Sequence, residues 1–227
     1  DIIRIAKESG KPVIVVLLAG SAMALSWEDE HVDAILDGFY PGAQGGAAIA
    51  EILFGGANPE GKLPITFYQT TEELPEFTDY AMKGRTYRYM ENEALYPFGY
   101  GLSYTTYAYG NLECVKPFDA QDGITLQVTV TNTGDREGTE TLQVYVKAKR
   151  EGTPNPQLKY VKKITLKPGE SVTEEIHLSP EAFMLYDEKG NFTLEKGAYD
   201  IFVGGCQPDA RSAALTGNAP QKLTVTY

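Results

Sequence analysis

A short run of ionisable and aromatic residues near the start of the chain is the densest concentration of groups that could do chemistry. Trp27 is the only tryptophan, and Glu28, Asp29, Glu30 and His31 follow it directly. Carboxylates and imidazoles act as general acids, bases and nucleophiles, and indole rings stack on the apolar surfaces of ligands. Residues adjacent in sequence do not by themselves converge on one bond, so this run is typical of a helix start or a solvated loop. We predict no catalytic residue here, and we select Trp27 and Glu28 as candidate substrate-binding residues.

The other reactive groups do not form a metal or cofactor motif. The two histidines, His31 and His177, are far apart in sequence, and neither has further ligands at metal-site spacing. The glycine-rich residues 42–46 lack the lysine-serine ending of a phosphate-binding loop and the spacing of a dinucleotide fingerprint. Lys62 could meet a carboxylate, although a structural turn is the simpler interpretation. We therefore predict no metal and no cofactor.

Bulk properties exclude several classes of partner. The chain has 227 residues and a net charge of −11, and nucleic-acid binding would need a positive surface. No segment approaches the roughly 20 apolar residues that span a bilayer, and we expect no signal peptide in these residues. The sequence opens inside a helical pattern without an initiator methionine, so we expect a piece of a longer, soluble, bacterial-looking protein. A cytoplasmic location is favoured over a secreted one, and we predict no nucleic-acid or membrane partner.

Two segments flank the acidic run and indicate an α/β arrangement. Residues 1–9 have the apolar spacing of a short helix, which Gly10 and Pro12 end. Residues 13–19 form a continuous aliphatic run, typical of a strand covered on both faces in a parallel sheet. Residues 32–39 are ambiguous by periodicity, and their short length favours a second strand. The acidic run would then lie in the loop after the first strand, where open α/β sheets place their ligands.

Residues 39–67 are the stretch around which the rest of the α/β part is arranged. Gly45 and Gly46 permit close backbone approach at a helix start, and residues 47–54 place apolar side chains around most of a helix surface. We expect this helix to be largely buried, with Glu51 on its solvent side. The expected order of helix, strand, strand and helix resembles the tail of a doubly wound sheet, with its first strands unpaired on one side. This deficit predicts a partial α/β sandwich.

Residues 81–109 are rich in tyrosine, glycine and arginine, and this enrichment admits two interpretations. Tyrosine rings beside Arg85 and Arg88 could stack on sugars, because aromatic faces match the apolar faces of pyranose rings. The same rings could instead form a strap between two domains, with each ring buried and each hydroxyl paired. We favour the strap, and sugar stacking remains the alternative.

From residue 111 onward the hydrophobic period changes to two. Residues 124–130 and 142–146 alternate apolar and polar side chains, and Asn-Thr-Gly at 132–134 supplies a turn. Further strands of an expected β-sandwich lie at residues 158–166, 171–178, 198–203 and 222–226. Two cysteines are too few for a disulfide framework, and Cys114 and Cys206 could pair only if their strands lie side by side.

Two long blocks of sequence carry recognisable motifs. The first block has YPG at 40–42, GG-x-AIA-x-ILFG at 45–55 and NP-x-GKLP-x-TF at 58–67. The second block is GRTYRYMENEALYPFGYGLSYT at 84–105. Both blocks resemble glycoside hydrolase family 3, the β-glucosidase and β-xylosidase family, and the second is similar to the junction sequence of that family. Its GRTYRY motif is more similar to the β-xylosidase branch of the family than to the β-glucosidase branch. The resemblance continues weakly to the end of the chain.

The resemblance implies three regions: the C-terminal part of an α/β sandwich domain at 1–80, a tyrosine-rich interdomain strap at 81–110, and a fibronectin type III-like β-sandwich at 111–227. It also implies a retaining, exo-acting β-glycosidase that removes terminal β-linked xylose or glucose from an oligosaccharide or aryl glycoside. Such chemistry needs two carboxyl groups about 5–5.5 Å apart. In the family both lie upstream of the residues matched here, in an N-terminal barrel and early in the α/β domain.

We therefore predict a C-terminal portion that is inactive alone and that pairs with the missing barrel and α/β portion. The alternative is a stand-alone carbohydrate-binding or structural module with no hydrolase activity.

Overall fold

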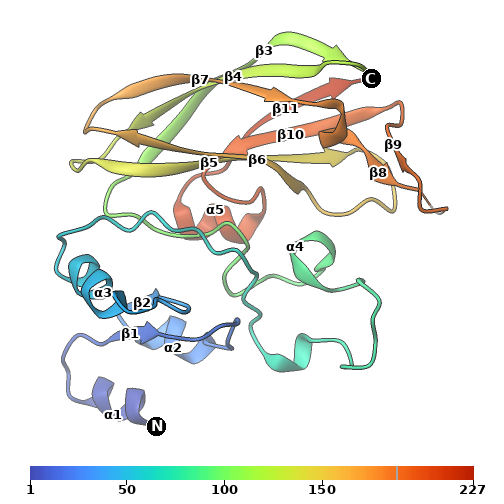
Figure 1. Ribbon diagram of the computed structural model, residues 1–227. Helices are drawn as coiled ribbons and strands as arrows, with labels where there is room; N and C mark the ends of the chain where they lie inside the picture. The colour runs from blue at the N-terminus through green and yellow to red at the C-terminus, as the bar shows by residue number, and fades with distance from the viewer. Residues whose placement is uncertain (188) are drawn as a thin grey trace.

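The computed structural model describes residues 1–187 and 189–227 and has two main layers (Figure 1). A β-sandwich occupies one side, and a small α/β segment, residues 1–67, lies on the other, drawn in blue to cyan. A long connecting segment, residues 68–106, has no sheet of its own and runs between them.

The α/β segment alternates short helices and strands. Its elements are α1 (Ile2–Glu8), β1 (Ile14–Leu17), α2 (Ser26–His31), β2 (Ala34–Asp37) and α3 (Gly45–Leu53). The two strands pair in parallel, with Ile14 opposite Ala34, and they confirm the expected strands. Because the acidic run forms α2, the order is helix, strand, helix, strand, helix, and the expectation of consecutive strands was wrong. A parallel pair needs such a crossover connection.

Burial in the α/β segment is lower than the sequence predicted. Ile14 and Val16 of β1 and Leu18 just after it are 49%, 37% and 57% exposed. Alternate side chains along this stretch therefore face an open side, and the expected double coverage is wrong. Helix α3 was expected to be largely buried, but Phe54 at its end is 89% exposed. Both patterns require protein on two sides, and the described chain supplies it on only one.

The connecting segment ties the two layers together with little regular structure. It contains a 3₁₀ turn, η1 (Thr71–Glu73), and one helical turn, α4 (Thr86–Tyr89). An antiparallel bridge joins Phe67 to Tyr96, and Phe67 packs with Leu25 and Leu95 in a small buried cluster.

The sandwich consists of a three-stranded and a four-stranded antiparallel sheet. The first has the order β3-β4-β7 and the second β11-β10-β5-β6. Their bounds are β3 (Tyr107–Asp119), β4 (Gly123–Asn132), β5 (Gly138–Ala148), β6 (Gln157–Leu166), β7 (Ser171–Leu178), β10 (Ala198–Gly204) and β11 (Gln221–Thr226). The remaining elements are η2 (Pro180–Phe183), the hairpin β8 (Leu185–Tyr186) with β9 (Phe192–Thr193), and α5 (Ala210–Thr216).

The expected alternation builds the sandwich core. Leu126, Val128 and Val130 from one sheet and Leu142, Val144 and Ile201 from the other are all fully buried in one cluster. Strand β3 was not identified from the sequence. Its pairing with β4 is interrupted by three register shifts, which break the period of two.

Two smaller expectations concern the cysteines and membrane segments. Cys114 on β3 is exposed, Cys206 after β10 is buried, and both thiols are free. Among the described residues, no helix is both long enough and apolar enough to cross a bilayer.

Candidate functional site

Helix α2 carries the candidate substrate-binding residues, and its tryptophan is already in contact with its own chain. The His31 ring stacks on Trp27 with 4.3 Å between ring centroids and 12° between planes. The guanidinium of Arg4 lies 4.2 Å from the Trp27 ring centroid. His31 Nδ1 also lies 2.7 Å from the Trp27 carbonyl oxygen. These contacts hold the indole in place and cover part of its surface. Substrate contact by Trp27 and Glu28 stays a prediction.

Within the acidic run, Asp29 has a structural role that its neighbours Glu28 and Glu30 do not share. Tyr96 donates its hydroxyl to Asp29 Oδ1 at 2.6 Å, and Arg211 Nη2 lies 3.4 Å from Asp29 Oδ2. Glu28 is half-buried and Glu30 is exposed on the same helix. Asp29 therefore joins α2 to the connecting segment and to α5, which lies on the face of the sandwich toward the α/β segment (Figure 1).

The aromatic partners of this joint are also packed. The Tyr96 ring stacks on Tyr100 with centroids 5.7 Å apart, and Arg211 Nε donates to the Leu95 carbonyl at 3.2 Å. Burial, together with the Asp29 carboxylate that accepts its hydrogen bond, raises the pKa of Tyr96. The hydroxyl therefore remains protonated and serves as a donor. The packed ring and paired hydroxyl of Tyr96 are what a strap between two domains would need, and the assignment of residues 81–110 as that strap stays a prediction.

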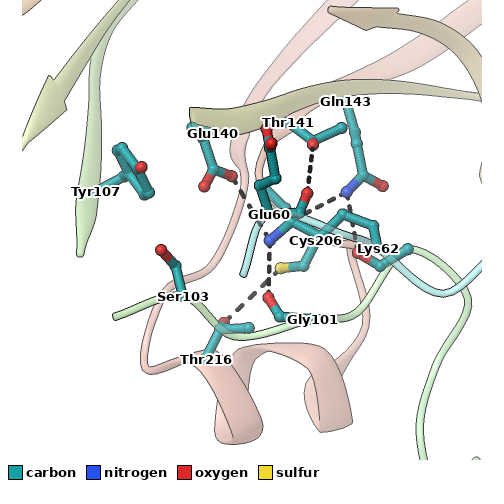
Figure 2. A network of polar contacts seen from close by, with 12 residues as sticks. Glu60, Lys62, Gly101, Ser103, Tyr107, Glu140, Thr141, Gln143, Cys206 and Thr216 are labelled. Carbon is teal, nitrogen blue, oxygen red and sulfur yellow. Dashed lines mark hydrogen bonds and ion pairs between the residues drawn. The ribbon is translucent and has the colours of Figure 1, made fainter. Parts of the chain in front are cut away.

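A second joint connects residues before the connecting segment to the sandwich (Figure 2). Lys62 Nζ donates to the Gly101 carbonyl at 2.8 Å and lies 3.8 Å from Glu140 Oε1. The side chains of Lys62 and Glu140 are only 15% and 6% exposed. Lys62 therefore meets a carboxylate, as the sequence allowed, and the carboxylate belongs to the sandwich.

Glu140 is the most constrained charge in this joint. It lies on β5, where Tyr109 of β3 donates its hydroxyl to Oε1 at 3.0 Å. A Cβ added at Gly205 would lie 2.1 Å from the same oxygen, so a larger residue there would displace the Glu140 carboxylate. Burial raises the pKa of Glu140 more than Lys62 and Tyr109 lower it. The ionised Glu140 carboxylate, which is buried with few hydrogen-bond partners, therefore lowers the stability of the folded state.

The outward face of β5 receives the connecting segment through uncharged groups (Figure 2). Gln143 Nε2 donates at 3.0 Å to the carbonyls of both Gly99 and Gly205. Tyr145 donates to Gln143 Oε1 at 2.6 Å, and both residues are almost completely buried. Gly99 has a φ of +78°, and an added Cβ would lie 2.3 Å from Gln143 Oε1. Polar residues of the strand are therefore buried by the chain that crosses them.

These joints contain functional candidates that the sequence did not reveal. Glu140, Asp29 and Arg211 act as joint residues, and none was selected for that role. One signal existed: Glu140 shares the inward register of Leu142 and Val144, where a charge needs a partner. Within residues 1–187 and 189–227, no group of three or more His, Cys, Asp or Glu side chains is arranged to hold a metal ion.

Two family models match the chain. The glycosyl hydrolase family 3 C-terminal domain matches residues 1–104, and the fibronectin type III-like domain matches residues 140–207. Curated relatives cover nearly all of the chain. A xylan 1,4-beta-xylosidase from Xylanibacter ruminicola is 41% identical over 220 residues, covering 95% of this chain and 25% of its own length. A periplasmic beta-glucosidase from Salmonella typhimurium is 40% identical over 219 residues, covering 90% of this chain and 29% of its own length.

Solved structures agree with these matches. A β-glucosidase from Erythrobacter marinus aligns with a TM-score of 0.81 and 34% identity, over 98% of this chain and 29% of its own. The Listeria innocua beta-glucosidase in complex with isofagomine aligns with a TM-score of 0.82 and 29% identity, over 99% and 32%. The chain thus spans about a quarter to a third of the length of these relatives. Its partial α/β sandwich and fibronectin type III-like sandwich are confirmed, and the chain belongs to glycoside hydrolase family 3, in the C-terminal region of the family's β-glucosidases and β-xylosidases.

Proposed function

We propose that this chain is the non-catalytic C-terminal part of a retaining, exo-acting β-glycosidase that releases terminal β-linked xylose or glucose. The catalytic nucleophile and the acid/base come from a preceding barrel and α/β portion, and this chain alone has no hydrolase activity. Its role is to complete the α/β sandwich and to fix that sandwich on the fibronectin type III-like domain. Xylose and glucose are the two candidate sugars, because the relatives are named as a xylosidase and a glucosidase.

The open face of β1 is the observation that carries this proposal. Ile14, Val16 and Leu18 expose aliphatic side chains on a sheet of only two parallel strands. Parallel sheets are stable when both faces are covered, so this surface requires further protein. The relatives are three to four times longer than the chain and supply a candidate for that cover.

The two joints explain how a non-catalytic part could influence the site. Lys62 with Glu140 and Asp29 with Arg211 hold the α/β segment at a fixed position on the sandwich. Positioning of reacting groups to within a fraction of an ångström governs catalytic rate. A sandwich that braces the α/β domain therefore contributes to turnover without touching the scissile bond.

The test is hydrolysis of aryl β-xyloside and aryl β-glucoside by the chain alone and by a mixture. The second component is the segment of the Xylanibacter ruminicola xylosidase that precedes its matching region. We expect no aryl release by the chain alone, activity in the mixture, and co-elution of the two pieces in size-exclusion chromatography. The preferred aryl glycoside identifies the sugar.

Variants in the mixture separate the roles. Trp27→Ala and Glu28→Gln should raise KM if these residues contact substrate, and Glu30→Gln, on the exposed side of the same helix, is the matched control. Hydrolysis by the purified chain alone would contradict the proposal. Absence of both complex and activity would favour the stand-alone binding or structural module.

A further inference from the structure

The aromatic residues of the connecting segment differ widely in exposure. Tyr87 is packed: its ring stacks on Phe98 with centroids 4.2 Å apart, and it meets Tyr145 edge-on at 6.4 Å. Phe77 and Tyr80 are the most exposed, at 92% and 89%. Packing between the connecting segment and the sandwich therefore does not account for these two rings.

The loop that carries the exposed rings is held together by one side chain. Arg85 donates to the carbonyl oxygens of Ala81 at 3.1 Å, Glu76 at 3.2 Å and Asp79 at 2.5 Å. The guanidinium thus closes residues 76–85 into a compact turn. The exposed rings are presented by a loop with internal hydrogen bonds, which lowers the entropy cost of ligand binding.

A cavity of about 250 Å³ lies at the base of this loop. Its lining residues, which combine charged, polar and aromatic side chains, are Tyr68, Glu73, Lys83, Gly84, Met90, Glu91 and Asn92. Glu73 and Lys83 bracket the loop with the exposed rings, so cavity and loop are continuous along the chain. The Thr86 amide donates to the Tyr68 hydroxyl at 2.9 Å, which fixes one wall.

The chemistry of these groups selects a neutral ligand with many hydroxyls. Carboxylates of Glu73 and Glu91 accept hydrogen bonds, and the Lys83 ammonium and Asn92 amide donate them. Two negative charges against one positive charge disfavour an anion. Drug-sized ligands fill about 300–1,000 Å³, so a cavity just below that range suits one sugar ring.

We propose that this cavity, together with the 76–85 loop, binds one pyranose unit of a neutral oligosaccharide. Glu73, Glu91, Lys83 and Asn92 hydrogen-bond its hydroxyls, and Phe77 and Tyr80 offer ring faces to it or to the adjoining sugar. The choice of a sugar among polyols rests on the proposed function. A protein partner would instead need a contiguous apolar surface, and the centre of this site is polar.

The experiment measures binding of xylotriose and cellotriose to the full chain by isothermal titration calorimetry and ligand-observed NMR. We expect millimolar or tighter binding of at least one trisaccharide. Phe77→Ala combined with Tyr80→Ala should weaken it at least tenfold, and Glu91→Gln at least threefold. Since both aromatic side chains are exposed, the thermal midpoint of the double variant should match that of the parent chain.

Tyr186→Ala is the matched control, because Tyr186 is 73% exposed but lies on the β8–β9 hairpin of the sandwich. It should leave binding unchanged. No binding of either trisaccharide by the parent chain overturns the inference, as does equal binding by the double variant. A change of oligomeric state in the double variant without any effect on sugar binding would overturn it in favour of a protein contact. None of these results depends on aryl glycoside hydrolysis, so this inference and the proposed function can fail separately.

Discussion

The sandwich and the α/β segment of the same chain differ sharply in how completely they bury their apolar residues. In the sandwich, Ile124, Val144 and Ile201 are inaccessible to solvent, and the core draws on both sheets. In the α/β segment, Ile2 and Ile14 are 84% and 49% exposed. The two regions have similar apolar side chains, but only one of them has a closed core.

The difference follows from how each fold obtains its cover. An antiparallel sandwich is closed by its own two sheets, so the residues from β3 onward suffice for a core. A doubly wound sheet needs many strands and helices on both faces, and two strands cannot supply them. The sandwich should thus be stable without other parts of the protein. The stability of the α/β segment should instead depend on the joints and on further protein.

Matched isoleucine truncations should show the largest contrast. Ile201→Ala removes a fully buried side chain of β10, whereas Ile14→Ala acts on the half-exposed strand β1. We expect a loss of about 2–5 kcal/mol in the free energy of unfolding for Ile201→Ala, and within about 0.5 kcal/mol for Ile14→Ala. Urea unfolding followed by circular dichroism measures both. Equal losses would show that β1 is as well packed as the sandwich.

Removal of Lys62 should be the next largest effect, because it acts where the two regions meet. Lys62→Met leaves the Tyr109 hydroxyl as the hydrogen-bond donor to the buried Glu140 carboxylate and should cost about 1–3 kcal/mol. Lys163→Met is the control, since Lys163 pairs with Glu60 at 3.2 Å across the same junction but is 59% exposed. An exposed pair contributes about 0–1 kcal/mol. Similar losses for the two variants would argue against a special role for the buried pair.

The second joint should respond more weakly. Tyr96→Phe removes only the hydroxyl that Asp29 accepts and should reduce stability by about 1 kcal/mol. Tyr186→Phe, on the exposed hairpin of the sandwich, should have no measurable effect. Hydrogen exchange of the α2 amides should accelerate in Tyr96→Phe alone. Unchanged exchange would mean that α2 is held by packing instead.

The smallest expected effect is a difference in pH dependence. Burial raises the pKa of Glu140 above its ordinary value of 4.5, so its protonation favours the folded state. Its contribution is complete below the unfolded pKa and is lost as the pH rises through the folded pKa. Relative to Glu140→Gln, the parent chain should therefore gain stability as the pH falls from 8 toward 5. Parallel stability curves for the two proteins would contradict a raised pKa.

Much of the fold could be read from local pattern. Strict alternation identified β4 and β5, because the period of two places one face of each strand in the core. Strand β3 escaped identification because its bulges shift the register, and Asn111 within it has a φ of 52°. The position of Glu28–Glu30 between the two strands was predicted, but the short length of α2 left a helix and a loop indistinguishable by periodicity.

The candidate site was less predictable than the fold. The sequence pointed to Trp27 and Glu28 by residue type. In the structure it is their neighbour Asp29 that contacts other parts of the chain, through Tyr96 and Arg211. The partner of Lys62 lies 78 positions further along, and that of Asp29 lies at residue 211. Sequence spacing carries no information on such pairs, since they meet only when the layers dock.

The sequence by itself determined the family, the two kinds of domain and the strands of the sandwich, because motifs and hydrophobic period are local properties. Only the tertiary structure decided which tyrosines are packed at the joints, that Phe77 and Tyr80 are exposed, and which carboxylates hold the layers together. Those outcomes depend on burial and on contacts between distant segments. The physical reason is that a charge or a hydroxyl acquires its role from the partner and the solvent that the folded chain places beside it.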